Sequence, residues 1–123
     1  ANGEIDLMEH LNFDDFVYQT VHSKYTLDGG SSPQKSTQAK INRQGYNTYG
    51  AEWDEDAITF TVNGKKTHTY PRVPEKGELQ WPFDQPFYLV LSMQVGGSWV
   101  GKGDPKDYPA EMEIDWIRVY ERK

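Results

Sequence analysis

The sequence predicts an all-β protein, built as a two-sheet antiparallel jelly-roll sandwich. Aromatic residues make up 14% of its 123 residues, and runs of Val, Ile, Thr and Tyr recur along the chain, a composition that favours strands. No segment has the apolar period of a long amphipathic helix. The apolar runs are short and are separated by turns that contain glycine and proline, as is typical of sandwiches and barrels. The length suits one small domain.

Seven segments have the alternation or the apolar character of strands. Two of them flank Asn63-Gly64, a dipeptide that predicts a two-residue hairpin turn. The most apolar segment lies near residue 90 and is expected to lie in the core. The predicted strands are residues 3–9, 16–25, 47–54, 57–62, 65–70, 87–95 and 111–121.

Two long polar segments separate the predicted strands. Residues 26–44 have Gly29-Gly30-Ser31-Ser32-Pro33 at their centre, and residues 96–109 are rich in glycine. Both segments are predicted to be loops. A loop as long as residues 26–44 is unusual inside a compact fold unless it has a function. We therefore expect it to rim a substrate cleft.

The first predicted strand carries three carboxylates within six residues. Side chains alternate between the two faces of a strand, so Glu4 and Asp6 share one face. The alternation then fails, because it would bury Glu9 and expose Met8. A β-bulge at Leu7-Met8 adds one residue, which buries Met8 and returns Glu9 to the face of Glu4 and Asp6.

This bulge predicts a particular distance between two glutamates. It places the Glu4 and Glu9 backbones about 13 Å apart. If both side chains lean inward over Asp6, their carboxyl groups are about 5 Å apart, the separation of a retaining glycosidase. The alternative is a face of acidic side chains that is merely solvated. Like charges stacked on one face repel each other, however, and a solvated strand requires no bulge.

The overall composition excludes several partners. The net charge is −6 and no basic block is present, so we expect neither nucleic acid nor an anionic membrane surface as a partner. No apolar run is long enough for a membrane span. The chain contains no cysteine, which excludes disulfides and thiolate metal sites. An acidic chain rich in aromatic residues suits neutral, polyhydroxylated ligands.

The strand motif resembles the active-site signature of glycoside hydrolase family 16. The motif is Glu4-x-Asp6-x-x-Glu9, preceded by Gly3, and its bulged form is similar to that of the laminarinase-like branch. Three further segments resemble family segments, in family order. They are residues 49–64 (YGAEWDEDAITFTVNG), residues 82–97 (PFDQPFYLVLSMQVGG) with Trp99, and residues 108–120 (YPAEMEIDWIRVY).

The resemblance implies a role for each carboxylate. Glu4 would be the nucleophile and Glu9 the general acid/base, while Asp6 would hydrogen-bond to Glu4 and hold it in position. Three clustered carboxylates cannot all ionise cheaply, so we expect their pKa values to be pushed apart. Glu9 would then remain protonated near neutral pH while Glu4 stays charged.

Further residues are assigned by the same resemblance. His22 is predicted to bind substrate, although a lone histidine is more often a structural hydrogen-bonding residue. Trp99 would stack on a sugar ring, or else plug the loop that carries it. Gln94 points away from the core of its predicted strand and would line the cleft. Asp115 resembles a ligand of a structural calcium ion, or is an ordinary strand carboxylate. Catalysis is expected to need no cofactor.

The family resemblance implies an endo-acting, retaining glycoside hydrolase that cleaves β-1,3-glucan or mixed-linkage β-1,3/1,4-glucan. The alternatives are the same fold acting on algal galactans (agarose, porphyran, carrageenan) and a non-catalytic carbohydrate-binding sandwich. Residues 1–123 would form the C-terminal half of one concanavalin-like domain. Its expected partners are a polysaccharide and a chain or segment that carries the N-terminal half. A secreted, periplasmic or cell-surface location would follow.

Overall fold

The computed structural model describes residues 3–122 and divides at Phe87 into two units. The first unit ends at Phe87 and contains all of the strands found among the described residues. The second unit, residues 88–122, contains the 3₁₀ turn η2 (Pro105–Asp107). The predicted domain over residues 1–123 also includes residues 1, 2 and 123, which lie outside the described part.

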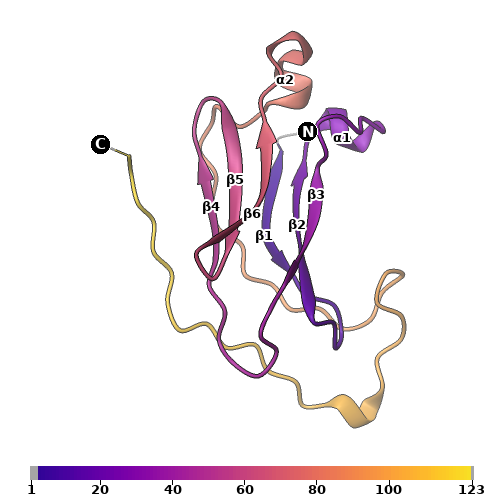
Figure 1. Ribbon diagram of the computed structural model, residues 1–123. Helices are drawn as coiled ribbons and strands as arrows, with labels where there is room; N and C mark the ends of the chain where they lie inside the picture. Colours follow the sequence, from indigo (N-terminus) through magenta and orange to yellow (C-terminus); the bar gives the residue numbers. More distant parts are fainter. Residues whose placement is uncertain (1–2, 123) are drawn as a thin grey trace. The chain divides into compact units, whose positions relative to one another are not determined.

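Two antiparallel sheets of three strands make up the first unit (Figure 1). The first sheet has the order β1-β2-β3, with β1 (Glu4–Glu9), β2 (Phe16–His22) and β3 (Ser36–Lys40). The second has the order β4-β5-β6, with β4 (Tyr49–Trp53), β5 (Ala57–Val62) and β6 (Lys65–Pro71). The prediction of an all-β fold with two antiparallel sheets is confirmed.

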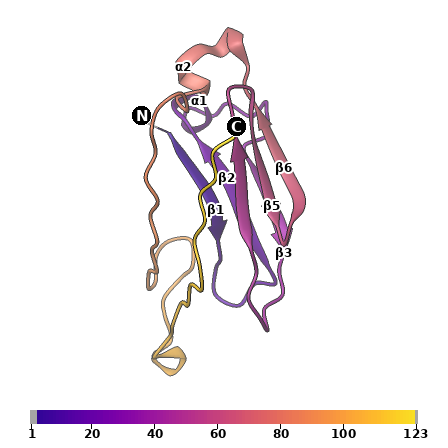
Figure 2. The same ribbon diagram turned by 90° about the vertical axis from the view of Figure 1, so that its left-hand side faces the viewer.

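The two sheets face each other across an apolar core (Figure 2). One cluster joins Val21 of β2 to Phe60 of β5 and Tyr70 of β6, together with Ile58, Trp81 and Phe83. A second cluster joins Val17 and Ala39 of the first sheet to Val62 of the second. Both clusters bury the alternate residues of β2 and β5, as a period of two requires.

The hairpin between β5 and β6 is confirmed. Asn63 and Gly64 have φ values of 52° and 76°, the left-handed backbone that a two-residue turn of this kind needs at both positions. Val62 then pairs directly with Lys65.

The prediction that residues 26–44 form a loop is wrong in part. β3 (Ser36–Lys40) pairs along β2, where its polar residues suit an edge strand with one exposed face. The preceding strand was also predicted too long. It ends at His22, because Ser23 caps the short helix α1 (Lys24–Leu27) by accepting a hydrogen bond from the Thr26 amide. A polar connection thus contains a helix and a strand that its composition did not indicate.

The predicted strands at residues 87–95 and 111–121 are not formed among the described residues. Both segments run without ladder hydrogen bonds, and Leu89 and Leu91 of the supposed core face are about half exposed, at 55% and 54%. A strand exists only when a neighbouring strand pairs with it, and no described segment pairs with either of these. The apolar alternation of residues 87–95 is typical of a strand, but the described residues contain no partner strand for it.

The connection after β6 contains two short turns of helix, η1 (Pro74–Lys76) and α2 (Gly77–Gln80). Trp81 follows α2 and is buried against Tyr70 and Phe83. None of the described helices has the length and apolar character needed to cross a membrane.

Candidate active site

The predicted β-bulge is present in β1. Asp6 pairs with Thr20 and Glu9 pairs with Tyr18, so two residues of β1 lie opposite the single residue Gln19. The two residues are Leu7 and Met8, at the predicted position.

The register places the three carboxylates on one face of the first sheet. Glu4, Asp6 and Glu9 pair with His22, Thr20 and Tyr18, which are alternate residues of β2. Directly opposite residues project from the same face of an antiparallel pair. The face opposite the core of the sandwich therefore carries the acidic cluster, as the sequence predicts.

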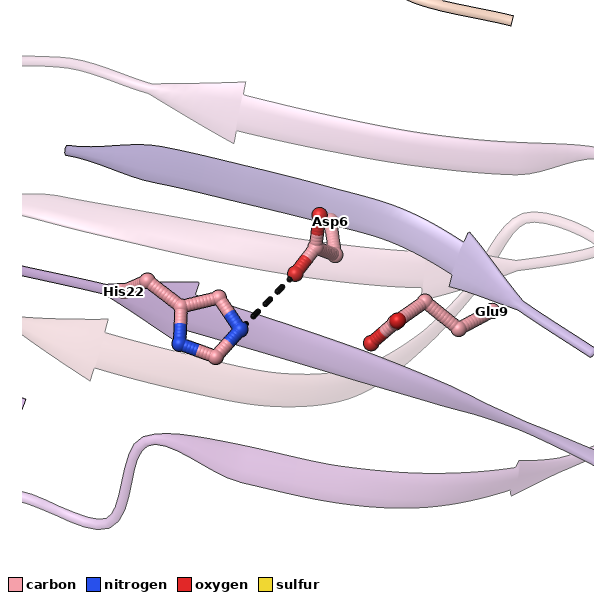
Figure 3. Close-up of side chains that lie close together, drawn as sticks. All are labelled: Asp6, Glu9 and His22. Carbon is pink, nitrogen blue, oxygen red and sulfur yellow. Dashed lines mark ion pairs between the residues drawn. The ribbon is translucent and has the colours of Figure 1, made fainter. Parts of the chain in front are cut away.

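Two carboxylates and one imidazole converge on this face (Figure 3). Asp6 and Glu9 project from β1 and His22 from β2 (Figure 3). The Nε2 atom of His22 lies 3.1 Å from Oδ2 of Asp6. One nitrogen or oxygen atom of each of the three side chains lies within 4.8 Å of the others. All three side chains are partly buried, whereas Glu4 is exposed.

The environment raises the pKa of two of these carboxyl groups. Burial, with a hydrogen bond to Glu4 and the negative charges of Glu4 and Glu9, raises the pKa of Asp6 to about 8. Burial also raises the pKa of Glu9, where the nearby Glu4 adds to the effect and His22 opposes it. The pKa of Glu9 moves in the predicted direction. The pKa of about 8 means that the middle carboxyl, Asp6, is largely protonated at neutral pH.

The same three side chains could coordinate a metal ion. Asp6, Glu9 and His22 offer two oxygen ligands and one nitrogen ligand, a set that suits a divalent transition metal. Such binding would require deprotonated carboxylates, while burial raises the pKa of both carboxyl groups and so opposes it. No second group of three His, Asp or Glu side chains this close together is found in the part of the chain that the structure describes.

Three predicted site residues lie in the second unit. Gln94 and Asp115 are exposed on extended segments, and Trp99 is 58% exposed beside the Gly97–Gly101 bridge. Their predicted roles in sugar or calcium binding stay predictions. The first unit alone brings together Glu4, Asp6, Glu9 and His22.

Sequence reasoning missed Gln19, which lies opposite the bulge and is fully buried. A signal was present in the sequence. Gln19 stands between Val17 and Val21, two apolar residues that share its face of the predicted strand, and an amide in such a position has to find hydrogen-bond partners inside the protein.

A two-sheet sandwich with paired glutamates on one bulged strand has the architecture and the functional groups of a carbohydrate-active enzyme. Comparison with known proteins agrees with this class. The chain belongs to the glycosyl hydrolases family 16, whose family model matches residues 1–118.

Relatives within the family differ in the sugars their names specify. The chain is 43% identical over 120 residues to a keratan-sulfate endo-1,4-beta-galactosidase of Sphingobacterium multivorum, covering 96% of this chain and 28% of that protein. It is 38% identical over 127 residues to a beta-glucanase of Rhodothermus marinus, covering 97% of this chain and 44% of the relative.

A solved structure supports the fold. The laminarinase of Rhodothermus marinus matches with a TM-score of 0.78 and 35% identity, covering 88% of this chain and 46% of that structure. The chain thus spans less than half the length of these relatives.

Proposed function

We propose that the protein containing this chain is an endo-acting, retaining glycoside hydrolase for a β-linked polysaccharide. One observation carries the proposal. The bulge in β1 brings Glu9 onto the face of Glu4 and Asp6, next to His22. Two glutamates flanking a sugar at short range are what a double displacement requires.

The two glutamates would share the reaction as follows. An oxygen of Glu4 attacks the anomeric carbon, and the bond to the leaving sugar oxygen breaks as Glu9 transfers its proton to that oxygen. Glu9, now a carboxylate, takes a proton from water, and the water oxygen displaces Glu4 from the anomeric carbon. Protonated Asp6 donates a hydrogen bond to Glu4 and so aims the nucleophile. The raised pKa of Glu9 supports its role as the acid.

For the substrate, the first candidate is β-1,3-glucan or mixed-linkage β-1,3/1,4-glucan. Its support is the bulged motif together with the relatives and the solved structures named beta-glucanase and laminarinase. The second candidate is a polysaccharide with β-galactosidic bonds, either an algal galactan or keratan sulfate. The 43% identity to a keratan-sulfate galactosidase favours this second candidate.

Product analysis separates the two candidates. The complete protein should be incubated with laminarin, barley β-glucan, agarose, carrageenan and keratan sulfate, and new reducing ends measured. We expect internal cleavage of one glucan or one galactan. The proposal fails if none of these polymers gains reducing ends.

A non-catalytic carbohydrate-binding sandwich is the rival function. Glu4→Gln removes the nucleophile while keeping its size and hydrogen-bonding capacity. Lost turnover with retained glycan affinity supports the enzyme. Glycan binding by the wild-type protein without any turnover supports the binding module.

The proposal also includes a location and a partner. A polysaccharide cannot cross a lipid bilayer unaided, so we propose that the protein acts in the periplasm, at the cell surface or in the medium. We further propose that a segment or chain outside residues 1–123 completes the sandwich and pairs with residues 87–95. The greater length of the relatives supports this.

A further inference from the structure

Gln19 is a fully buried polar residue at an apolar position. It lies on the core-facing side of β2, between Val17 and Val21. These two valines belong to separate core clusters, so the glutamine side chain lies where one apolar cluster ends and the other begins. A buried amide is costly unless each of its polar atoms finds a partner.

The amide of Gln19 has three partners on three strands. Its Nε2 donates one hydrogen bond to the Leu7 carbonyl oxygen of β1, at 3.0 Å, and one to the Thr61 carbonyl oxygen of β5, at 3.1 Å. Its Oε1 accepts a hydrogen bond from the Thr67 hydroxyl of β6. Both donors and the acceptor of the side chain are satisfied, and the amide ties the first sheet to the second.

Two of these partners belong to β-bulges. Leu7 is part of the β1 bulge opposite Gln19. In the second sheet, Phe60 pairs with His68 and Thr61 pairs with Lys66, so Thr67 is the extra residue of a bulge in β6. A bulge interrupts its ladder and leaves one residue outside the pairing. The Gln19 side chain supplies a hydrogen-bond partner to a residue of each of the two bulges.

We propose that Gln19 is a positioning residue that fixes the register of the β1 bulge and, through it, the place of Glu9 relative to Glu4. The inference rests on the proposed function of the two glutamates. Glu4 and Asp6 precede the bulge and Glu9 follows it, so loss of the link displaces Glu9 alone. A slip of one residue would turn Glu9 toward the core and Met8 toward the sugar.

The role of Gln19 in placing Glu9 predicts that its loss impairs protonation of the leaving group. Glu9 protonates the leaving group, which a natural sugar needs and an activated aryl leaving group such as dinitrophenolate does not. The Glu4 nucleophile is used with both substrates. Loss of Gln19 therefore lowers kcat/KM, which reports the first step, more for the polysaccharide than for the activated aryl oligosaccharide of the same sugar.

The test replaces Gln19 by Met in the complete protein. Methionine keeps the length of the side chain and removes all three hydrogen bonds. Gln80 provides the matched control, because it is also fully buried and also bonds to backbone groups, those of Pro71 and Val73. Thr67→Val is the milder second variant, since it removes the Thr67 hydroxyl with little change of volume.

The expected result for Gln19→Met is a fall in kcat/KM on the polysaccharide on the order of 100-fold, the cost of a misplaced catalytic group. The kcat/KM of the aryl oligosaccharide, which reports attack by Glu4 without help from an acid, should fall far less. Gln80→Met should change kcat/KM for both substrates by the same factor. Thr67→Val should show the same difference between the substrates as Gln19→Met, but a smaller one. Equal losses on both substrates for Gln19→Met overturn the inference. If that variant does not fold, the same comparison is made with Thr67→Val, and equal rates or equal losses overturn it.

A structural readout is independent of turnover. In a crystal structure of Gln19→Met, we expect the pairing of Glu9 with Tyr18 to be lost. Retention of that pairing overturns the inference. If the wild-type protein cleaves no glycan, the proposed function is wrong. The strand register in the crystal structure of Gln19→Met then still tests whether Gln19 fixes the bulge.

Discussion

The Nε2 atom of His22 lies 3.1 Å from Oδ2 of Asp6, although the two residues are not directly opposite each other. His22 pairs with Glu4 and Asp6 pairs with Thr20, so the contact runs diagonally across the β1–β2 pair. Burial raises the pKa of Asp6 to about 8, and the contact therefore joins the imidazole to a neutral carboxyl at pH 7. Asp6 is a proton-holding group in the middle of the cluster, and this property can be measured.

The first prediction concerns stability against pH. Because the pKa of Asp6 is raised from 3.8 to about 8, the folded protein keeps a proton that the unfolded chain releases above about pH 4. Stability should thus fall as pH rises from 4 to 8, by at most about 1.4 kcal/mol per pH unit from this one group. Asp6→Asn removes the titration and should flatten the slope, as measured by urea unfolding across this range. Equal slopes for the two proteins would contradict the assignment.

The second prediction concerns Glu9 as the acid. Glu9→Gln should lower kcat on the polysaccharide by about 10²- to 10⁴-fold, the usual contribution of a positioned acid/base. The first step with an activated aryl substrate should survive, and added azide should restore turnover by replacing the activated water. Since burial raises the pKa of Glu9, the wild-type rate should fall on the alkaline side at a pH above the ordinary pKa of a glutamate. If Glu9→Gln lowers kcat/KM equally for both substrates, Glu9 has a role other than general acid.

The third prediction concerns His22. Its side chain is 30% exposed beside Asp6, so the imidazole ring can meet a sugar bound over the acidic cluster. We expect His22→Ala to raise KM about 3- to 10-fold, the effect of one lost hydrogen bond. His68→Ala is the control, because His68 bonds to the Gln34 carbonyl oxygen away from the acidic cluster. If His22→Ala has a normal KM and a lowered melting temperature, the role of His22 is structural.

The fourth prediction concerns the glycine before the motif. Gly3 has φ +77°, and a Cβ atom there would lie 2.7 Å from Pro82 Cγ and 2.8 Å from Phe83 Cε1. Gly64 has nearly the same φ, +76°, with nothing within 4 Å of a Cβ atom. Gly64→Ala should therefore cost only the backbone strain, about 1 kcal/mol. Gly3→Ala adds overpacking and should cost about 2–4 kcal/mol of unfolding free energy. Equal melting temperatures for the two variants would refute the clash.

Much of the first unit follows from local patterns in the sequence. The bulge could be predicted because Met8 is out of phase with the apolar Ile5 and Leu7, while Glu9 is out of phase with Glu4 and Asp6. The hairpin could be predicted because Asn63 and Gly64 favour a left-handed backbone. Each of these signals lies within a few residues of the feature it predicts.

Features that depend on distant residues were not predicted. β3 is a strand because β2 offers a free edge, and its own polar sequence resembles a loop. The apolar alternation of residues 87–95 indicates a strand only if another segment pairs with it. The pKa of Asp6 depends on burial, which composition does not reveal, and the Gln19 link joins residues from four strands.

The stereochemistry of the first product tests the central claim most directly. Proton NMR of the anomeric signals should be recorded during early hydrolysis of the preferred β-linked polysaccharide by the complete protein. A double displacement with Glu4 as nucleophile and Glu9 as acid/base predicts retention, so the β-anomer of the new reducing end should appear first and then mutarotate. An α-anomer that appears first means inversion, and it would contradict Glu4 as the nucleophile.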